Sequence, residues 1–219
     1  MTKDQIDRIS SRFPSRWFRN YLRSKLKSDP LYDAVYDELK GSNLPLLDIG
    51  CGLGVLAFYL REQGLTFPIR GLDYDKRKTD QATHVAQELN DDDCTFAEHD
   101  AREGIPEHLG NVTILDILQF FTPEELDHLV TTASDRVAPG GKLVIRSGLK
   151  DNSTRFKITV AGDLLAKATF WMKDAPTHYP TAEDFERILS PHGKVTISPL
   201  WGPTPFNNHL IVLEKQAAP

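Results

Sequence analysis

The chain alternates short apolar runs with longer segments of helical periodicity. Each apolar run ends in a polar or glycine-containing turn, a pattern that predicts buried strands connected by helices. Five such runs lie at 44–49, 67–72, 94–100, 111–121 and 138–147. Helices are predicted at 76–89 and from Thr122-Pro123, where a capping box and a proline at the first helical position mark the start. Strands that alternate with helices are typical of a parallel sheet.

The end of the chain predicts a different connection. Another capped helix begins at Thr181, and two apolar runs then follow closely, at 194–200 and 209–215. These two runs predict an antiparallel hairpin. The sequence therefore predicts an α/β fold, a Rossmann-like seven-stranded mixed sheet with helices on both faces and an antiparallel last strand. Ligands of such sheets bind at the carboxyl ends of the strands.

The first 41 residues predict a helical cap ahead of the main domain, which we place at 42–219. One helix begins at Pro14 and Ser15, and on a helical wheel its apolar and basic residues separate. The apolar side holds Trp17, Phe18, Tyr21, Leu22 and Leu26, and the basic side holds Arg16, Arg19, Arg23 and Lys27. A second helix is expected from Asp29 as cap and Pro30 at the first position to Gly41 as stop.

Charge is spread unevenly. Residues 1–27 hold eight basic and two acidic residues, so this arm carries +6, whereas the whole chain carries −5 and the remainder −11. One hypothesis is that the arm covers a pocket, with Trp17, Phe18, Tyr21 and Leu22 facing inward. Arg16, Arg19 and Arg23 would then meet an anionic substrate or an acidic carrier. The alternative is that the arm folds back on the acidic body.

A glycine-rich loop follows the first predicted strand. The segment LPLLDIGCGLG places Asp48 near the strand end and Gly50, Gly52 and Gly54 at alternate positions, with Cys51 between them. Glycines between a strand and a helix leave backbone N–H groups open to a polar or anionic part of a ligand. The dinucleotide pattern requires its third glycine one residue later, at Val55.

This Asp-x-Gly-x-Gly-x-Gly segment resembles the first motif of the class I S-adenosylmethionine-dependent methyltransferases. The resemblance extends from Leu44 to Lys215 and implies S-adenosylmethionine as the cofactor, with Asp48 and residues 50–54 beside it. Asp73, after the second strand, suits a bidentate hydrogen bond to a ribose diol. Its rival Asp75 is expected to cap the next helix. The resemblance also places Tyr74 near the adenine, and Asp100 and Ala101 at the adenine edge.

The fourth strand runs into a segment that resembles the family motif beside the methyl group and the substrate. In this segment Asp116 either contributes to the cofactor site or only accepts a hydrogen bond from the backbone. Gln119 stands where relatives often carry histidine, and it cannot act as a base. If a base is needed, the candidates are Asp116, His178 and Tyr179. The catalytic residue is unassigned, because methyl transfer mainly requires alignment and exclusion of water.

Residues 148–180 are too long for a simple connection and are expected to form a lid. Its helix would carry an apolar face listed as Leu164, Leu165, Phe170, Trp171 and Met172. Two cysteines form no disulfide framework, seven histidines show no metal-ligand spacing, and no apolar run reaches the length of a membrane span. These features favour a cytoplasmic protein without a metal.

The methyl acceptor is predicted to be a small or carrier-bound molecule, with O-methylation favoured, and the basic arm would suit an anionic one. Nucleic acid is a less favoured partner, because no Asn/Asp-Pro-Pro-Tyr run follows the fourth strand. Two alternatives stay open: a nucleic-acid or protein methyltransferase, and a non-catalytic protein that binds S-adenosylmethionine. The oligomeric state is not determined by these patterns.

Overall fold

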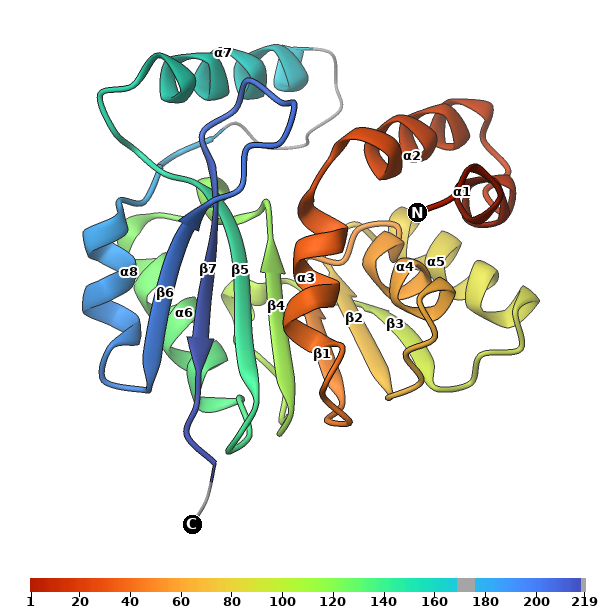
Figure 1. Ribbon diagram of the computed structural model, residues 1–219, viewed down its shortest axis with the longest axis horizontal. Coiled ribbons are helices and arrows are strands. Elements are labelled where there is room, and N and C mark those ends of the chain that lie inside the picture. Colours follow the sequence, from red (N-terminus) through yellow and green to blue (C-terminus); the bar gives the residue numbers. More distant parts are fainter. Residues whose placement is uncertain (169–175, 218–219) are drawn as a thin grey trace.

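A computed structural model describes residues 1–168 and 176–217, with side chains described to Asp163 in the first range. Its sheet has seven strands in the order β3-β2-β1-β4-β5-β7-β6 (Figure 1). Their bounds are β1 Leu46–Ile49, β2 Ile69–Asp73, β3 Cys94–Glu98, β4 Asn111–Leu115, β5 Lys142–Gly148, β6 Lys194–Pro199 and β7 Asn208–Glu214. The described pairs among β1 to β5 are parallel, whereas β7 runs antiparallel to both β5 and β6. The predicted fold class is confirmed.

Helices cover both faces of the sheet, unequally. Their bounds are α1 Lys3–Ser11, α2 Arg16–Ser28, α3 Leu31–Leu39, α4 Val55–Glu62, α5 Lys76–Glu88, α6 Pro123–Asp135, α7 Thr154–Ala168 and α8 Ala182–Leu189, with short 3-10 turns at Ala101–Glu103 and Leu118–Phe120. One apolar core contains residues of the helices α1, α2, α3, α4 and α5. These pack with Leu46, Ile69 and Val144 of the sheet. The other core joins α6 and α8 to Leu47 and Ile114. The alternation of neighbouring strand residues between two cores is the period-two pattern of a sheet buried on both faces.

The N-terminal cap contains one more helix than predicted. The segment at Lys3–Ser11 is a helix with a capping box between Thr2 and Gln5. It packs against α2, and Ile9 and Phe13 join the same buried core as Leu22. The missed signal is the Thr-x-x-Gln start, which is a capping box in a segment otherwise too polar to stand out.

The amphipathic helix forms where expected, but its apolar side is only partly inward. Leu22 and Leu26 are buried in the core, whereas Trp17 is 53% exposed, so the expectation that Trp17 faces inward is wrong. Its ring lies parallel to that of Tyr21, with centroids 5.9 Å apart. At the next helix the N-cap position is Pro30, while the Asp29 carboxylate accepts from the Leu31 N–H at 3.0 Å.

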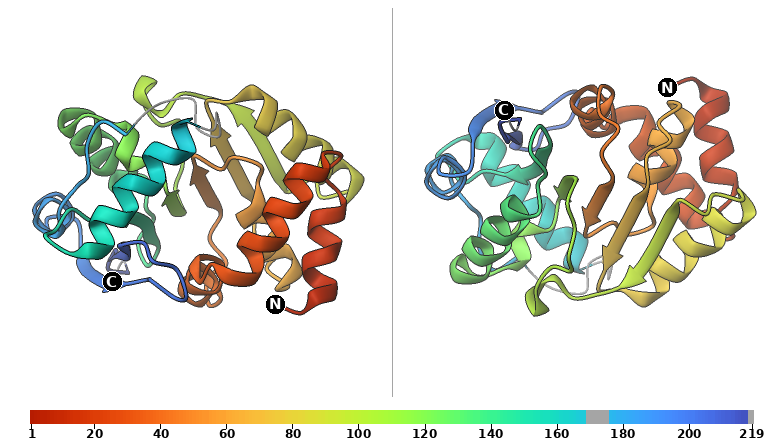
Figure 2. Two further views of the ribbon diagram at one scale, coloured as in Figure 1. Left: turned by 90° about the horizontal axis from the view of Figure 1, so that it is seen from above. Right: turned by 90° about the horizontal axis from the view of Figure 1, so that it is seen from below.

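Two helices stand above the carboxyl edge of the sheet. Seen from above, α2 and α7 lie on opposite sides of the strand ends (Figure 2). The described part of the predicted lid, 148–180, thus lies at the expected edge, but Phe170, Trp171 and Met172 fall outside the described residues, as do the side chains of Leu164 and Leu165. Among the described residues, no helix is long and apolar enough to cross a membrane.

Candidate functional site

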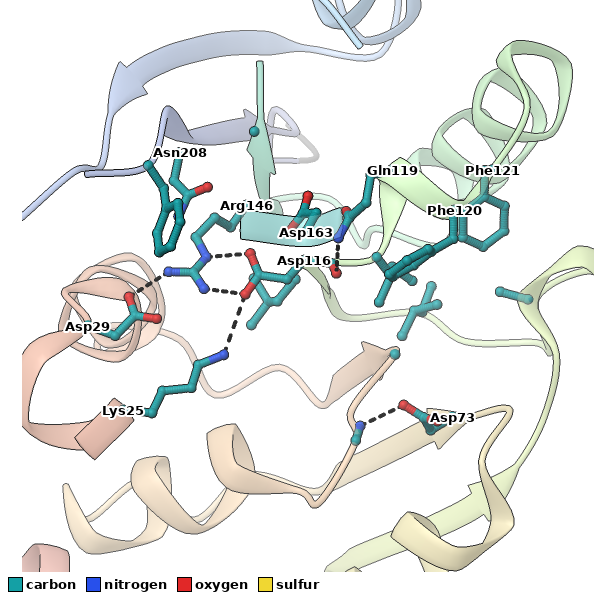
Figure 3. A pocket seen from close by; sticks show the side chains of 18 of the residues that line it. Lys25, Asp29, Asp73, Asp116, Gln119, Phe120, Phe121, Arg146, Asp163 and Asn208 are labelled. Atoms are coloured by element: carbon teal, nitrogen blue, oxygen red, sulfur yellow. Dashed lines mark hydrogen bonds and ion pairs between the residues drawn. The ribbon is translucent and has the colours of Figure 1, made fainter. Parts of the chain in front are cut away.

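A cavity of about 530 Å³ opens at the carboxyl edge of the parallel strands, where the fold predicts a ligand. It is lined by the loop after β1, the ends of β2 to β5, and residues of α2 and α7. Figure 3 shows that Asp73 lies at one end of this cavity and that Asp116 and Arg146 lie at another. We call these two parts the Asp73 end and the Arg146 end.

The glycine loop shapes the Asp73 end, and its three glycines have different roles. Gly50, Gly52 and Gly54 all have positive φ, a conformation that side chains other than glycine rarely adopt. A Cβ at Gly50 would lie 2.6 Å from Ile117, and one at Gly54 would lie 2.6 Å from Phe96. A Cβ at Gly52 would meet only an Asp73 oxygen, at 4.0 Å. Gly52 is therefore the glycine whose bare backbone is open to a ligand.

Asp73 holds its carboxylate in place by two backbone hydrogen bonds. The Gly52 N–H donates to Oδ2 at 2.8 Å, and the Asp75 N–H donates to Oδ1 at 2.8 Å. Each carboxylate oxygen has a second acceptor position, so both can still receive a hydroxyl of a diol. Asp75 caps α5 by accepting from the Arg77 N–H and also pairs with the Arg77 side chain, as expected for the rival residue.

The predicted adenine residues line the same cavity. Tyr74 is 37% exposed, and Asp100 and Ala101 follow β3 at the start of a 3-10 turn. The Asp100 carboxylate accepts from the Arg102 N–H and pairs with the Arg102 guanidinium at 3.2 Å. It is thereby fixed at the rim, with acceptor positions remaining for an amine.

Asp48 is buried and does not line the main cavity. It is 2% exposed, accepts from the Thr113 hydroxyl at 2.7 Å, and lines a smaller cavity of about 130 Å³ together with Cys51. Burial raises the pKa of Asp48 to about 7, with the Thr113 hydrogen bond opposing and the Asp73 charge adding to the shift. Burial also raises the pKa of the Cys51 thiol, so Cys51 lacks the thiolate character of a nucleophile.

The Arg146 end contains a network of four charges around one buried guanidinium. Arg146, on β5, has a side chain only 5% exposed and pairs with Asp29 at 2.5 Å and with both oxygens of Asp116. Lys25, on α2, adds a contact to Asp116 at 3.5 Å (Figure 3). Burial acts to raise the pKa of Asp116, but the charges of Arg146 and Lys25 lower it below its usual value. Asp116 is therefore a poor proton acceptor.

The backbone around Asp116 is also unusual. Its φ of 61° is left-handed, a region that aspartate tolerates better than most residues. The Asp116 N–H donates to the Arg146 carbonyl at 3.1 Å, and the Gln119 side-chain amide donates to the Asp116 carbonyl at 3.0 Å. The residue is held by backbone and side chain alike, which makes its carboxylate position rigid.

Three residues of the Arg146 end were not predicted from the sequence. Lys25 was not assigned to the pocket, and Arg146 and Asp163 were not considered at all. Arg146 had a readable signal, because a charge inside the apolar run LVIRS must find a buried partner. Of the base candidates, Asp116 and Tyr179 line the cavity, whereas His178 lines a separate small pocket beside α6.

The residues present suit an S-adenosylmethionine-like ligand. The open backbone at Gly52 and the bidentate carboxylate of Asp73 fit a ribose beside the glycine loop. Asp100, Ala101 and Tyr74 line the adjoining rim, which suits an adenine. Among the described residues, no cluster of three metal-ligating side chains occurs.

Comparison with known proteins identifies the family. A family of methyltransferase domains matches residues 40–201 of the chain. A curated relative is the mouse tRNA N(3)-cytidine methyltransferase METTL6, 26% identical over 155 residues, which are 68% of this chain and 54% of the relative. The chain thus spans about half the length of that relative.

Two solved structures share the fold. The magnesium protoporphyrin IX methyltransferase of Synechocystis PCC 6803, with bound SAH, aligns with a TM-score of 0.65 and 17% identity over 97% of this chain and 94% of that one. An O-methyltransferase family protein from Burkholderia thailandensis aligns with a TM-score of 0.69 and 17% identity over 95% of this chain and 63% of that one. The chain belongs to the methyltransferase domain family and has the fold of the class I S-adenosylmethionine-dependent enzymes.

Proposed function

We propose that this protein transfers the methyl group of S-adenosylmethionine to a small organic acceptor, bound at the Arg146 end of the cavity. The observation that carries the proposal is one continuous cavity that combines the Gly52–Asp73 site with a second chamber lined by residues of α2 and α7. The first chamber fits the cofactor, and the second leaves room for an acceptor. Gly50, Tyr74, Asp100, Ala101 and Asp116 complete the lining, while Asp48, Cys51 and Gly54 shape the glycine loop behind it.

The chain's own residues would perform the remaining tasks of the reaction. S-adenosylmethionine supplies an electrophilic methyl group when bound, so the protein mainly aligns the acceptor and excludes water. The aromatic side chains of Tyr21, Phe120 and Phe206 line the cavity and suit an apolar acceptor body. Residues 1–41 act as its cap, and the described part of 148–180, which carries α7, acts as its lid.

Transfer to nucleic acid is the second candidate, favoured by the similarity to a tRNA methyltransferase. The basic arm gives it limited support, because three of its arginines have partners within the chain. Arg8 pairs with Glu62 at 2.7 Å, Arg23 with Asp7 at 2.8 Å, and Arg12 with Glu88 at 4.0 Å. The Arg8 and Arg12 pairs join the arm to α4 and α5 and favour the arm folding back on the body, whereas the Arg23–Asp7 pair lies within the arm. Both cysteines are free, which agrees with a cytoplasmic location.

The cofactor half of the proposal is tested by calorimetry with S-adenosylmethionine. Gly52→Val places a branched side chain in the open backbone and should weaken binding at least about tenfold, or about 1.4 kcal/mol. Gly64→Val is the matched control, because Gly64 also has positive φ but its Cβ would meet nothing within 4 Å. Equal binding by the Gly52→Val protein would contradict the proposed site.

The acceptor half is tested with methyl-tritiated S-adenosylmethionine. The protein is incubated in parallel with a small-molecule extract and with a total tRNA pool. Label in small organic products supports the proposal, and label confined to tRNA favours the second candidate. Cofactor binding without transfer to either pool would favour the alternative hypothesis of a non-catalytic protein that binds S-adenosylmethionine.

A further inference from the structure

Asp163 is the carboxylate that α7 contributes to the lining of the cavity. It lies on α7, four residues after Thr159, and both residues line the chamber at the Arg146 end. Thr159 fixes this part of the helix, since its hydroxyl donates to the Arg155 carbonyl at 3.0 Å and accepts from the Asn207 N–H at 2.8 Å. The Asp163 carboxylate is therefore carried into the chamber on an anchored turn (Figure 3).

Tyr179 orients this carboxylate. Its hydroxyl donates to Asp163 Oδ2 at 2.8 Å, and its ring packs edge-to-face against Phe156 with centroids 5.3 Å apart. Within the part of the chain that the structure describes, Asp163 forms no ion pair and Tyr179 is its hydrogen-bond partner. One oxygen is thus held and the other, Oδ1, remains for a ligand.

The remaining carboxylates of the cavity are already neutralised or tied down. Asp29 and Asp116 pair with Arg146, and Asp100 pairs with Arg102. Asp73 accepts two backbone N–H groups. Burial raises the pKa of Asp163, the Tyr179 hydrogen bond opposes that shift, and the Asp116 charge adds to it. A carboxylate with a raised pKa is a better proton acceptor than one stabilised by a cation.

We propose that Asp163 accepts the proton of a neutral hydroxyl or amine acceptor and that Tyr179 positions it to do so. The inference rests on the proposed function. The acceptor oxygen or nitrogen forms the new bond to the methyl carbon, and the carbon–sulfur bond breaks with its electron pair on sulfur. The acceptor's proton passes to Asp163 Oδ1, which becomes neutral.

This assignment also excludes one class of acceptor. A carboxylate has no proton to give, and its negative charge would be repelled by Asp163. The apolar walls of the chamber, including Phe120 and Phe206, suit a flat organic body that presents a neutral polar group. The substrate class that follows is an aromatic or otherwise apolar alcohol, phenol or amine.

The test follows the carboxyl carbon of Asp163 by NMR in protein labelled at the aspartate carboxyl carbons and saturated with S-adenosylhomocysteine. Asp163→Asn assigns the signal. We expect it to titrate above the ordinary aspartate range, and higher still in Tyr179→Phe, which removes the opposing hydrogen bond. The other titratable or charged groups that line this part of the cavity are Tyr21 and Lys25 on α2, Asp29 after α2, Asp116 after β4, Arg146 on β5 and Tyr179.

Phenol and benzoate are the matched probes. Phenol should shift the Asp163 signal, and its affinity should fall about tenfold in Asp163→Asn, as expected on loss of a charge-assisted hydrogen bond. Benzoate should bind the wild-type protein more weakly than phenol and should gain affinity in Asp163→Asn. The control is Asp80→Asn, an exposed aspartate of α5 paired with Lys76, which should change neither probe.

The inference is overturned if Asp163 titrates in or below the ordinary range, if phenol leaves its signal unchanged, or if benzoate binds as well as phenol. Calorimetry with S-adenosylhomocysteine on the same samples separates two failures. A protein that binds S-adenosylhomocysteine but ignores phenol loses this inference and keeps the proposed function. A protein that binds no S-adenosylhomocysteine loses the proposed function, and the probe results still decide whether Asp163 receives a neutral protic group.

Discussion

The two ends of the cavity are formed by different chemical groups, backbone N–H groups at the Asp73 end and paired charged side chains at the Arg146 end. The Asp73 end comes from short local segments, the β1–α4 loop and the ends of β2 and β3, and its carboxylate meets backbone N–H groups. The Arg146 end comes from side chains far apart in sequence, with Asp116 and Asp29 gathered around one guanidinium. A site made of backbone is encoded locally, whereas a site made of paired charges depends on the whole fold.

The difference predicts different responses to mutation. At the Asp73 end, the loop geometry is maintained by glycines and strand pairing, so removal of a side chain should mainly affect ligand binding. At the Arg146 end, Asp116 and Asp29 share one buried guanidinium, so removal of Arg146 leaves two partly buried carboxylates without their cation. Loss of that guanidinium should mainly affect stability.

Arg146→Gln should give the largest effect. It leaves Asp116 and Asp29 without their buried cation and should reduce the free energy of unfolding by about 3–5 kcal/mol. Urea denaturation measures this change. The control is Arg187→Gln, which breaks an exposed pair with Asp127 at 2.8 Å and should cost less than about 1 kcal/mol. Equal losses in the two variants would refute the claim that the buried network holds this end together.

Asp48 should make stability depend on pH. Its folded pKa of about 7 exceeds the unfolded value, so the folded state binds the extra proton. Stability from this group is therefore full at low pH and declines as pH rises from about 4 to about 7, by on the order of 2–4 kcal/mol. Asp48→Asn stays neutral and should remove that slope in denaturation curves measured across this range. A slope that persists in the variant would have to come from another group.

Asp73→Ala should weaken S-adenosylmethionine binding by about 1.5–3 kcal/mol, the range for hydrogen bonds to a charged group. Calorimetry on the folded variant measures the loss. Asp75→Ala is the control, because it removes a helix cap and should lower stability by about 1 kcal/mol while leaving binding nearly unchanged. If Asp75→Ala weakens binding more than Asp73→Ala, the ribose assignment is wrong.

The same contrast explains how much the sequence predicted. The succession of strands and helices along the chain and the place of Asp73 at the end of the second strand follow from apolar runs and the residues that end them, because these patterns are local. The second chamber is lined by Lys25, Arg146 and Asp163, which come from three elements far apart in the sequence. No local sequence pattern indicates that these residues lie together. The wheel of α2 separated apolar from basic residues correctly, yet it placed Trp17 inward. A helical wheel does not show which neighbouring elements cover the apolar side. Here α1 packs into the core with Leu22, whereas Trp17 remains exposed.

Lys25→Met should have the smallest effect and sharpen the comparison most. Lys25 contacts Asp116 at 3.5 Å with a side chain 22% exposed, and methionine replaces its apolar stem while removing the charge. Because Arg146 still neutralises Asp116, no buried charge is left alone. The expected loss of stability is therefore below about 1 kcal/mol.

Hydrogen exchange separates two possible roles of that contact. If Lys25 ties α2 to the rim of the cavity, the amides of α2 should exchange faster in Lys25→Met while those of β4 and β5 stay protected. A loss of stability as large as that of Arg146→Gln would mean that the cation on α2 and the cation on β5 share the network equally. The Arg146 end would then depend on the cap as much as on the sheet, and the contrast with the locally built Asp73 end would become wider.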